Sequence, residues 1–203
     1  MRQHPFVFLT GCDEDNKPVA TQIPVFIDQK GEQIFLTGHM MKETDHHKAF
    51  LQNPHALAVF TGAHTYVSAS WYSNPLTAST WNYMSVHAKG ILRFMDEESL
   101  LKILQRTTNH FENDPASPSL FEKLPGEYVQ RLVKAIAGFE IEVLEIDHVF
   151  KLSQDRDEKS YHNIIEKLGH KDPGAKKIAE EMAPRASRLF DNMKQGQNDS
   201  LEP

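Results

Sequence analysis

The chain has 203 residues, of which 39% are hydrophobic and 25% are charged, and its formal net charge is −6. This is the composition of a globular chain long enough to bury a core, which excludes wholesale disorder, and its acidic balance argues against sequence-independent attraction to nucleic-acid phosphates. The single cysteine, Cys12, excludes an internal disulfide, and with no signal pattern and no apolar run of the ~18 residues that a membrane span needs, the expected location is the cytoplasm.

The first ninety residues are rich in predicted β-strands. Apolar or loosely alternating runs, separated by polar turns, cover residues 6–9, 19–27 and 33–37. Strands that follow one another through short turns form a meander, which is the usual start of an antiparallel sheet or barrel.

A short helix interrupts this region. Asp45 is its predicted N-cap, and the helix runs through Leu51 before Asn53-Pro54 ends it. This is the first place where the hydrophobic pattern departs from that of a strand.

Strands resume after the helix. Two are expected on either side of Gly62, over residues 56–60 and 65–70. A longer strand is expected over 83–94, in which Gly90 indicates a bulge or a point of close packing.

The hydrophobic period changes after this strand. Apolar residues at helical spacing predict one helix over 97–111, with Asp96 as its N-cap, and a second over 127–137. The next run, 139–146, alternates strictly between apolar and polar residues and is the clearest strand in the sequence.

The C-terminal part is polar and helical. Helices are expected over 160–168 and 173–190, with Pro173 in a first turn and Pro184 interrupting the second helix, and residues 191–203 are expected to be a flexible, solvated tail.

These elements predict an α+β fold with a mostly antiparallel β-barrel or sandwich core, inserted helices and a helical C-terminus. The expected division is a barrel domain over 1–150 with a helical insertion at 96–137, a C-terminal helical extension of the same domain over 151–190, and the tail.

Motifs of metal and nucleotide chemistry are missing. The adjacent His46-His47 would point in different directions on a helix and the other histidines have no ligand spacing, so no metal site is expected. The sequence has no Gly-x-Ser-x-Gly elbow and no Gly-x-Gly-x-x-Gly or Walker loop, which argues against a Rossmann nucleotide site.

Aromatic residues gather in one segment. Both tryptophans, Trp71 and Trp81, and three of the five tyrosines fall between Tyr66 and Tyr83. Aromatic rings flanked by Ser, Thr, Asn and His can stack on a flat ligand, but they can equally plug a barrel end or form a dimer contact. Composition alone leaves both interpretations open.

Several blocks of the sequence resemble one known family. They stand in the family's order across about residues 6–168: Thr37-Gly-His-Met40, the stretch 62–72, Thr80-Trp-Asn-Tyr83 with Val86-His87 and Gly90, Ala137-Gly-Phe-Glu-Ile141 and Lys151-Leu-Ser-Gln154. The pattern is similar to that of the PaiB-like FMN-binding proteins, which are regarded as negative transcriptional regulators and share the split β-barrel of pyridoxamine-phosphate oxidases and flavin reductases. The resemblance implies an FMN-binding split β-barrel that forms a homodimer with the flavin at its interface.

The resemblance also implies a phosphate site. A phosphate needs cations and hydroxyl or backbone donors, preferably near a helix N-terminus. The span between the Thr37 block and Asn53-Pro54 supplies such groups, and the residues expected to contribute are His39, Lys42, Thr44, His47 and Lys48. The sequence departs from the family here, because Met41-Lys42-Glu43-Thr44 replaces a stretch that usually holds an arginine and an Asn-Pro pair.

The isoalloxazine ring is expected against the second strand, where its polar edge would meet Thr21, Gln22 and Ile23. The residues expected to close over the ring, from the same or the second protomer, are Trp81, Asn82 and Tyr83, with Trp71 at the rim. Gln22 or His87 could stabilise a reduced anionic flavin. The Lys151-Leu-Ser-Gln154 block would either reach this cleft or cap the C-terminal helices.

Three functions follow from the resemblance. The first is a flavin-dependent oxidoreductase or redox-sensing flavoprotein, whose small-molecule redox partner the sequence does not identify. The second is a transcriptional repressor; direct DNA binding is not supported by the net charge, although the terminal helices contain Lys176, Lys177, Arg185 and Arg188. The third is a haem-binding or haem-degrading protein, which the eleven histidines leave open.

Overall fold

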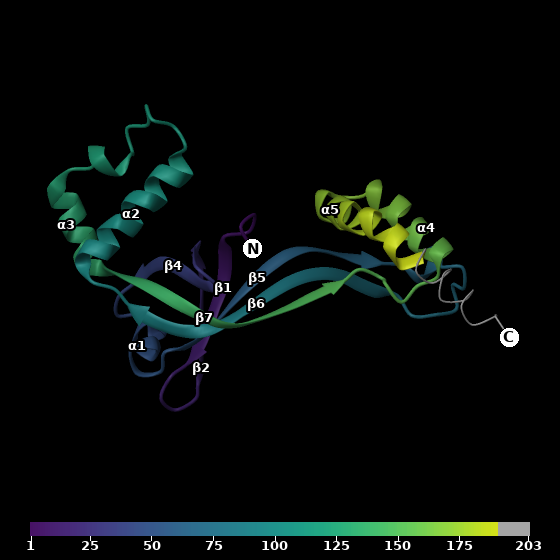
Figure 1. Cartoon of the computed structure of the whole chain (residues 1–203), viewed down its shortest axis with the longest axis horizontal. Coiled ribbons are helices and arrows are strands. Elements are labelled where there is room, and N and C mark those ends of the chain that lie inside the picture. Colours follow the sequence, from purple (N-terminus) through teal and green to yellow (C-terminus); the bar gives the residue numbers. More distant parts are fainter. Residues whose placement is uncertain (191–203) are drawn as a thin grey trace. The chain divides into compact units, whose positions relative to one another are not determined.

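The computed structural model describes residues 1–190. Seven strands form one sheet in the order β2-β1-β5-β6-β7-β4-β3 (Figure 1). Their bounds are β1 (Phe6–Cys12), β2 (Pro18–Pro24), β3 (Phe26–Lys30), β4 (Gln33–Met41), β5 (His55–Val67), β6 (Thr80–Phe94) and β7 (Ile136–Lys151).

Five α-helices and three short 3₁₀-helices accompany the strands in the described chain. The α-helices are α1 (Asp45–Gln52), α2 (Glu97–Glu112), α3 (Gly126–Ala135), α4 (Glu158–Gly169) and α5 (Pro173–Met182), and the 3₁₀-helices are η1 (Ala69–Trp71), η2 (Phe121–Lys123) and η3 (Ala183–Arg185). None of these helices is both long and apolar enough to cross a membrane.

The contacts of the chain fall into two compact units. The first, called the barrel unit here, contains residues 1–61 and 86–147, and the second, called the helical unit, contains residues 62–85 and the described residues from 148 onward. The long strands β5, β6 and β7 contribute one segment to each unit.

The barrel unit closes where the chain passes from β2 to β3. These two strands form opposite edges of the sheet, yet only Val25 separates them in sequence. On one side of Val25, Pro24 pairs with Phe6 of β1, and on the other side Phe26 pairs with Thr37 of β4. The two edges therefore meet at this residue, and the sheet curls into a barrel. The predicted α+β fold with a mostly antiparallel split β-barrel is confirmed.

The barrel core follows from strand alternation. Val7 and Leu9 are fully buried while Phe6 and Phe8 between them are exposed, as a strand with one buried face requires. The buried side chains of this core are all apolar: Val7, Leu9, Ile23, Val25, Leu36, Met40, Phe50, Ala56, Ala58, Phe60, Ala88, Leu92, Phe139 and Ile141.

Close packing explains Gly90. A Cβ placed there would collide with the backbone carbonyl oxygen of Glu142 on β7. Of the two interpretations of Gly90, close packing is therefore the one that the structure supports.

Three predicted boundaries near the N-terminus were wrong. The run 19–27 is two strands, because the chain changes pairing partner at Val25. The N-cap of α1 is Thr44, whose hydroxyl accepts a hydrogen bond from the His47 N–H, rather than Asp45. The strands predicted on either side of Gly62 are one strand, β5, because Gly62 continues the strand at close range to Met84 of β6.

One later boundary also differs. Strand β7 begins at Ile136 rather than after Gly138, because residues 136–138 already pair with β4 through Met41, Met40 and His39. The helical region expected over 173–190 is interrupted at Pro184 as predicted: α5 ends at Met182, η3 contains Pro184, and residues 186–190 are helical again. Asp96 caps α2 as predicted.

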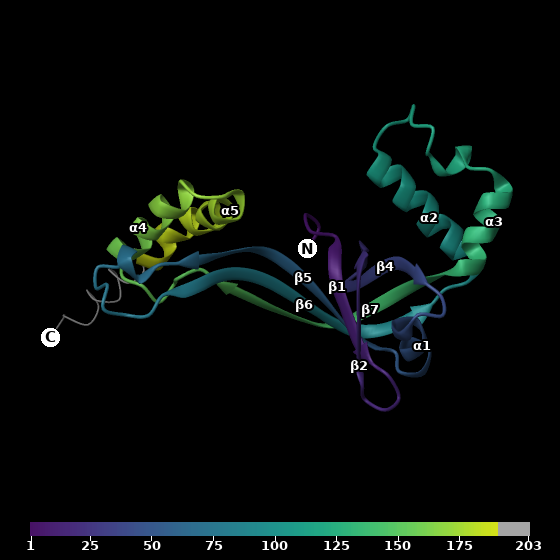
Figure 2. The same ribbon diagram turned by 180° about the vertical axis from the view of Figure 1, so that it is seen from behind.

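The helical unit has its own core. Helices α4 and α5 pack on each other beside the strand segments of this unit (Figures 1 and 2). Each helix begins with an aspartate cap, Asp157 and Asp172, and Pro173 occupies the first turn of α5 as expected. The sequence-based division placed residues 62–85 in the barrel domain, whereas their contacts group them with the helices. The predicted tail, 191–203, lies outside the described residues.

Candidate functional site

The predicted phosphate site lies where β4 leads into α1. Thr44 caps the helix: its hydroxyl donates to the Met41 carbonyl at 3.0 Å and accepts from the His47 N–H at 3.3 Å. The Asp45 carboxylate accepts from the His46 N–H at 2.7 Å, and this bond is the main reason why the pKa of Asp45 lies below its usual value. These two N–H groups of the first turn already have acceptors, so side chains would have to hold an added anion.

Two lysines flank this helix start. The Lys42 Nζ donates to the Val133 carbonyl at 3.2 Å, and the Lys48 Nζ lies 3.4 Å from a Glu43 carboxylate oxygen. The Lys48 and Glu43 side chains are both mostly exposed, and exposed ion pairs of this kind contribute little to stability. Lys48 can therefore leave Glu43 and pair with an anion of higher charge. The first turn of α1, where Lys48 lies, also favours negative charge through the helix dipole.

Two histidines of this region, His39 and His47, have surroundings that disfavour a positive charge. His47 is buried against Phe94, with ring centroids 4.9 Å apart, and its Nδ1 accepts from the Glu43 N–H at 3.3 Å. Burial lowers the pKa of His47 and of His39, which favours the neutral rings. The expected His47-Lys48 pair is thus split, with Lys48 exposed and His47 in the core.

The predicted ring-edge residues lie on an edge strand. Within the described sheet, β2 pairs with β1 alone, so the backbone groups on its other edge are outside any ladder. Ile23 is buried in the barrel core, Thr21 is half-buried, and Gln22 is exposed opposite Phe8 of β1. The backbone of β2 and the Gln22 side chain therefore carry the polar groups that a ligand could reach.

The aromatic residues belong to the helical unit, where β6 alternates. Trp81 and Tyr83 are 54% and 38% exposed, and the Trp81 ring centroid lies 5.9 Å from that of Tyr66 and 6.3 Å from that of His64. These rings form an exposed aromatic face on β5 and β6 that could stack on a flat molecule.

Asn82 points the other way. It has no exposed surface; its Oδ1 accepts from the Ser153 hydroxyl at 3.0 Å and its Nδ2 lies 3.5 Å from the Met182 sulfur. We correct the expectation for its side chain, because a ligand contact would require Asn82 to leave the helical core. Strand alternation between Trp81 and Tyr83 is the signal that could have shown this.

The remaining predicted residues have mixed surroundings. Trp71 is half-buried, its carbonyl accepts from the Asn163 amide at 3.1 Å, and the Lys171 Nζ lies 5.4 Å from its ring. His87 is half-buried in the barrel-unit part of β6, and its charge contributes to the lowered pKa of Asp147 after the larger effect of Lys89.

The Lys151-Leu-Ser-Gln154 block holds the helical unit together. The Lys151 Nζ bonds to the Thr80 hydroxyl at 2.7 Å, Ser153 bonds to Asn82, and the Gln154 amide group bonds to the backbone at Phe150 and Leu152. Of the two roles left open for this block, the structural one is the role that these contacts support.

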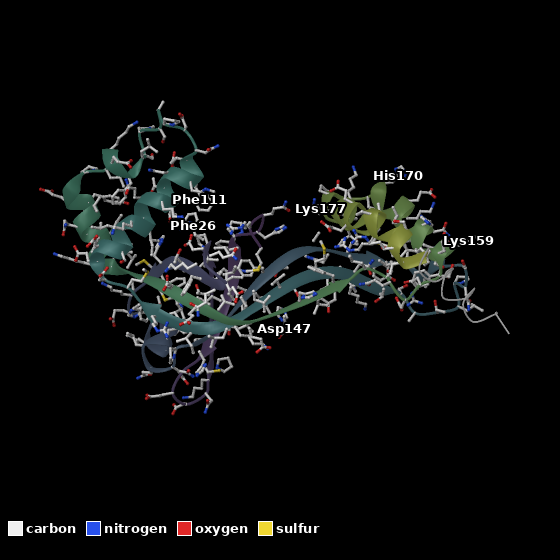
Figure 3. The ribbon with its side chains drawn as sticks, in the orientation of Figure 1. Phe26, Phe111, Asp147, Lys159, His170 and Lys177 are labelled. Atoms are coloured by element: carbon white, nitrogen blue, oxygen red, sulfur yellow. The ribbon has the colours of Figure 1, made fainter. Side chains whose placement is uncertain are left out.

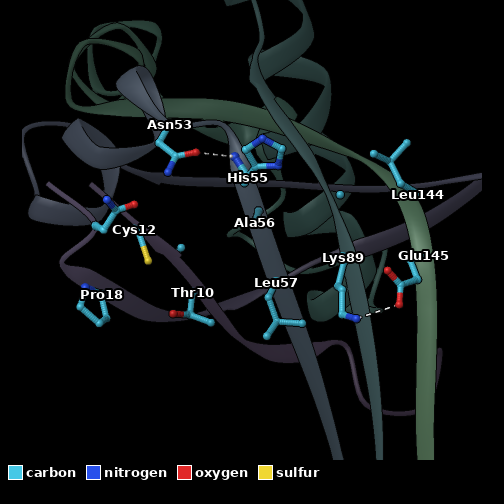
Figure 4. Close-up of a pocket in the computed structure, with 13 residues that line it drawn as sticks. Thr10, Cys12, Pro18, Asn53, His55, Ala56, Leu57, Lys89, Leu144 and Glu145 are labelled. Atoms are coloured by element: carbon cyan, nitrogen blue, oxygen red, sulfur yellow. Dashed lines mark hydrogen bonds and ion pairs between the residues drawn. The ribbon is translucent and has the colours of Figure 1, made fainter. Parts of the chain in front are cut away.

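The structure adds a cavity that the sequence did not indicate. It lies in the barrel unit, has a volume of about 600 Å³, and is shown in Figure 4. Its lining comes from β1, β5, β6 and β7 and their neighbouring turns: Thr10, Gly11, Cys12, Asn16, Pro18, Asn53, His55, Ala56, Leu57, Lys89, Gly90, Leu144 and Glu145. This volume is in the range of small-molecule sites, roughly 300–1,000 Å³.

The lysine of this cavity is already paired. The Lys89 Nζ bonds to Asp147 at 2.7 Å and to Glu145 at 2.8 Å, and these bonds raise the pKa of Lys89 above its ordinary value. Two carboxylates against one ammonium leave a net negative charge, so Lys89 is a poor partner for a phosphate.

No group of three or more His, Cys, Asp or Glu side chains that could hold a metal ion occurs within residues 1–190.

Sequence comparison with known proteins finds matches that cover most of the chain. A family model described as a putative FMN-binding domain matches residues 1–145. The protein named protease synthase and sporulation protein PAI 2, from Bacillus subtilis strain 168, is 34% identical over 176 residues, which cover 86% of this chain and 84% of that protein. An uncharacterised protein of Emericella nidulans is 26% identical, with 64% of each chain covered.

Among solved structures, an FAD and heme binding protein from Mycobacterium smegmatis has a TM-score of 0.49 at 16% identity, with 72% of this chain and 65% of that chain covered. A putative 5-nitroimidazole antibiotic resistance protein from Bacteroides thetaiotaomicron has a TM-score of 0.48 at 15% identity, with 72% and 76% covered.

Proposed function

Because the chain belongs to the putative FMN-binding domain family, we propose that it is a flavoprotein that binds FMN and holds the FMN phosphate at the start of α1. The observation that carries this proposal is the pair of lysines, Lys42 and Lys48, that flank the Thr44-capped helix start. Two ammonium groups beside the positive end of a helix dipole are a set of groups that a phosphate dianion favours.

The fit of this donor set to a phosphate has one cost. Glu43 and Asp45 bring negative charge to the same helix start, but both side chains are mostly exposed, so solvent screens them. The Lys48 ammonium would leave Glu43 for the phosphate, while Lys42 keeps its bond to Val133 as an anchor. The bound flavin would supply the capacity to accept and donate electrons, and the protein would position it.

The rest of the flavin would meet two surfaces. The free edge of β2, with the Gln22 side chain, would hydrogen-bond the polar edge of the ring. The exposed aromatic face, Trp81 and Tyr83 above all, would stack on the ring from the second protomer of a homodimer.

A homodimer also accounts for exposed apolar side chains on β1 and β7 in the barrel unit. Phe6, Phe8, Leu144 and Ile146 are between 40% and 65% exposed. Large exposed apolar residues mark interaction surfaces where they form a patch. Light scattering coupled to gel filtration should give about twice the 23.2 kDa of one chain, and a monomer that still binds FMN would refute the interface part of the proposal.

The phosphate site is tested by comparing FMN with riboflavin, which lacks the phosphate. Lys48→Gln should weaken FMN binding about tenfold, equivalent to ~1.4 kcal/mol, and leave riboflavin binding unchanged. Flavin fluorescence quenching measures both affinities.

The control is Lys102→Gln, which removes an exposed lysine of α2 that pairs with Glu98. It should change neither affinity. Equal weakening of FMN and riboflavin by Lys48→Gln, or no binding of either flavin to the unsubstituted protein, would contradict the proposal.

Oxidoreductase activity and regulation are separate questions. Bleaching of bound FMN by NADH or NADPH at turnover rates would favour an oxidoreductase over a redox sensor. A Soret band on addition of haemin would instead support the haem hypothesis.

Direct DNA binding receives little support from the terminal helices. Lys177 pairs with Glu180 at 3.2 Å, and Arg185 pairs with Glu181 at 2.9 Å, so two of the four basic residues noted in the terminal helices are compensated. We expect no gel shift whose affinity falls with salt; a steep salt dependence would contradict this expectation.

A further inference from the structure

A second cavity, of about 320 Å³, lies in the barrel unit where the inserted helix α2 meets the passage from β2 to β3. Its lining residues are Arg2, Pro5, Val25, Phe26, Ile27, Arg106 and His110. None of them belongs to the expected flavin contacts or to the larger cavity of Figure 4.

The cavity carries an excess of positive charge in a chain whose net charge is −6. Arg2 donates to the Ile27 carbonyl at 3.1 Å, and within residues 1–190 it has no carboxylate partner. Arg106 donates to the Asp28 carboxylate at 2.7 Å. Each guanidinium has five N–H donors, so both retain donors for a ligand.

Asp28 fixes Arg106 without neutralising the site. Its carboxylate also accepts from the Thr37 hydroxyl at 3.1 Å, and the hydrogen bond from Arg106 is the main cause of its lowered pKa. The carboxylate thus stays ionised and holds one guanidinium in place. Two guanidinium groups against one carboxylate leave a net positive charge.

Aromatic surface adjoins these cations. The Arg106 guanidinium lies 4.1 Å from the Phe26 ring centroid, which orients it. The His110 ring meets Phe26 edge-on at 5.4 Å, and Phe111 lies beside both rings, 6.4 Å from Phe26 and 54% exposed (Figure 3). An exposed ring beside fixed cations can stack on the aromatic part of a ligand while the cations bind the ligand's negative charge.

We propose that this cavity binds a small aromatic phosphate monoester. Arg2 and Arg106 hold the phosphate, because guanidinium groups match its oxygens two at a time and a dianion balances their excess charge. Phe26, which lines the cavity, and the exposed Phe111 beside it contact the ring of the ligand. The volume is at the lower end of the small-molecule range, roughly 300–1,000 Å³, which suits one ring rather than a tricyclic flavin.

The proposal gives the helical insertion a role. Helix α2 supplies Arg106 and His110, while the strand passage supplies Phe26 and Ile27. The site therefore exists only because α2 packs beside this passage.

Isothermal titration with phenyl phosphate tests the proposal, with phenol as the uncharged counterpart. Phenyl phosphate should bind the FMN-free and the FMN-saturated protein with similar affinity, and phenol should bind at least tenfold more weakly. Arg2→Gln and Arg106→Gln should each weaken phenyl phosphate at least tenfold. Arg106→Lys keeps the charge and should lose less.

The matched control is Arg131→Gln, which removes an exposed arginine of α3 that lies 5.8 Å from the Tyr128 ring centroid. It should leave phenyl phosphate binding unchanged, and thermal denaturation verifies that each variant is folded. Unaltered binding to Arg2→Gln and Arg106→Gln, or no binding to the unsubstituted protein at millimolar phenyl phosphate, overturns the proposal.

The relation to the flavin site is decided separately. If FMN blocks phenyl phosphate, the cavity belongs to the flavin site and the proposal fails, while the FMN proposal stands. If Lys48→Gln weakens FMN binding as expected but phenyl phosphate does not bind the unsubstituted protein, the phenyl phosphate proposal fails and the FMN proposal stands.

Discussion

The barrel unit and the helical unit bury their polar side chains to different depths. In the barrel unit the buried polar side chains, Thr37, His47 and Ser117, each keep 7% of their surface exposed, and the largest fully buried ring is the apolar Phe139. The helical unit buries Asn82 and Ser153, which are bonded to each other, and the Tyr161 hydroxyl, which donates to the Met182 carbonyl at 3.0 Å. Both cores are close-packed, but the buried hydrogen bonds of the helical unit also fix which donor meets which acceptor.

The difference extends to the surfaces. In the barrel unit, cations gather at the start of α1 and beside α2, where an anion could bind. In the helical unit, exposed aromatic rings gather on β5 and β6. The first unit offers charge to a ligand and the second offers flat apolar surface.

The barrel core should show the largest stability effect. Phe139 is fully buried, and its ring lies so close to Gly38 that a Cβ there would be 2.9 Å from it. Phe139→Ala should lower the free energy of unfolding by about 3–5 kcal/mol, because it removes apolar contacts and leaves a cavity. Urea unfolding measures the change.

A matched phenylalanine sharpens this test. Phe111 is 54% exposed, so Phe111→Ala should change the free energy of unfolding by less than about 1 kcal/mol. Similar losses for both variants would show that the barrel core is not the main source of stability in this unit.

The buried polar pair of the helical unit should show an intermediate effect. Asn82→Ala removes the acceptor of the Ser153 hydroxyl and leaves that hydroxyl buried, which should cost about 1–3 kcal/mol. Trp71, in the same unit, gives a fluorescence signal for unfolding. If the pair acts as a unit, Asn82→Ala and Ser153→Ala should be non-additive by about 0.5 kcal/mol or more. If the losses in free energy of unfolding of the two single variants simply add in the double variant, the hydrogen bond between the two side chains does not contribute to stability.

The sequence predicted the elements well but not their pairing. Helical spacing located all five α-helices, and alternation located the β-regions, although it merged β2 with β3 and divided β5 in two. The barrel closure at Val25 could not be predicted, because nothing local shows that the chain changes partners between Pro24 and Phe26.

The candidate site was predictable only in part. The cations at the start of α1 follow from local sequence, and Thr44 rather than Asp45 as cap is a shift of one residue. The burial of His47 against Phe94 depends on a strand 47 residues further along the chain, so spacing could not reveal it. The Arg2–Arg106 cavity brings together residues from the two separate sequence segments of the barrel unit, and no local sequence motif contains both.

The aspartate caps of the helical unit should give the smallest effect, one that depends on pH. Asp157 accepts from the Ser160 hydroxyl at 2.6 Å, from the Ser160 N–H at 2.9 Å and from the Ser73 hydroxyl at 3.0 Å, and the Ser160 hydroxyl bond is the main cause of its lowered pKa. A folded pKa below the unfolded value of about 3.9 contributes stability above that pH, and this contribution is lost as the pH falls through the folded pKa.

Asp157→Asn keeps a side chain that caps helices well but does not titrate. The variant should therefore lose less stability than the unsubstituted protein between about pH 5 and pH 3, as measured by Trp71 fluorescence during urea unfolding. Glu166→Gln removes an exposed carboxylate from the middle of the same helix and should leave the pH profile unchanged. A loss of acid sensitivity in Asp157→Asn would localise this part of the acid response to the cap of α4 in the helical unit. An unchanged profile would instead place the response in carboxylates other than this cap.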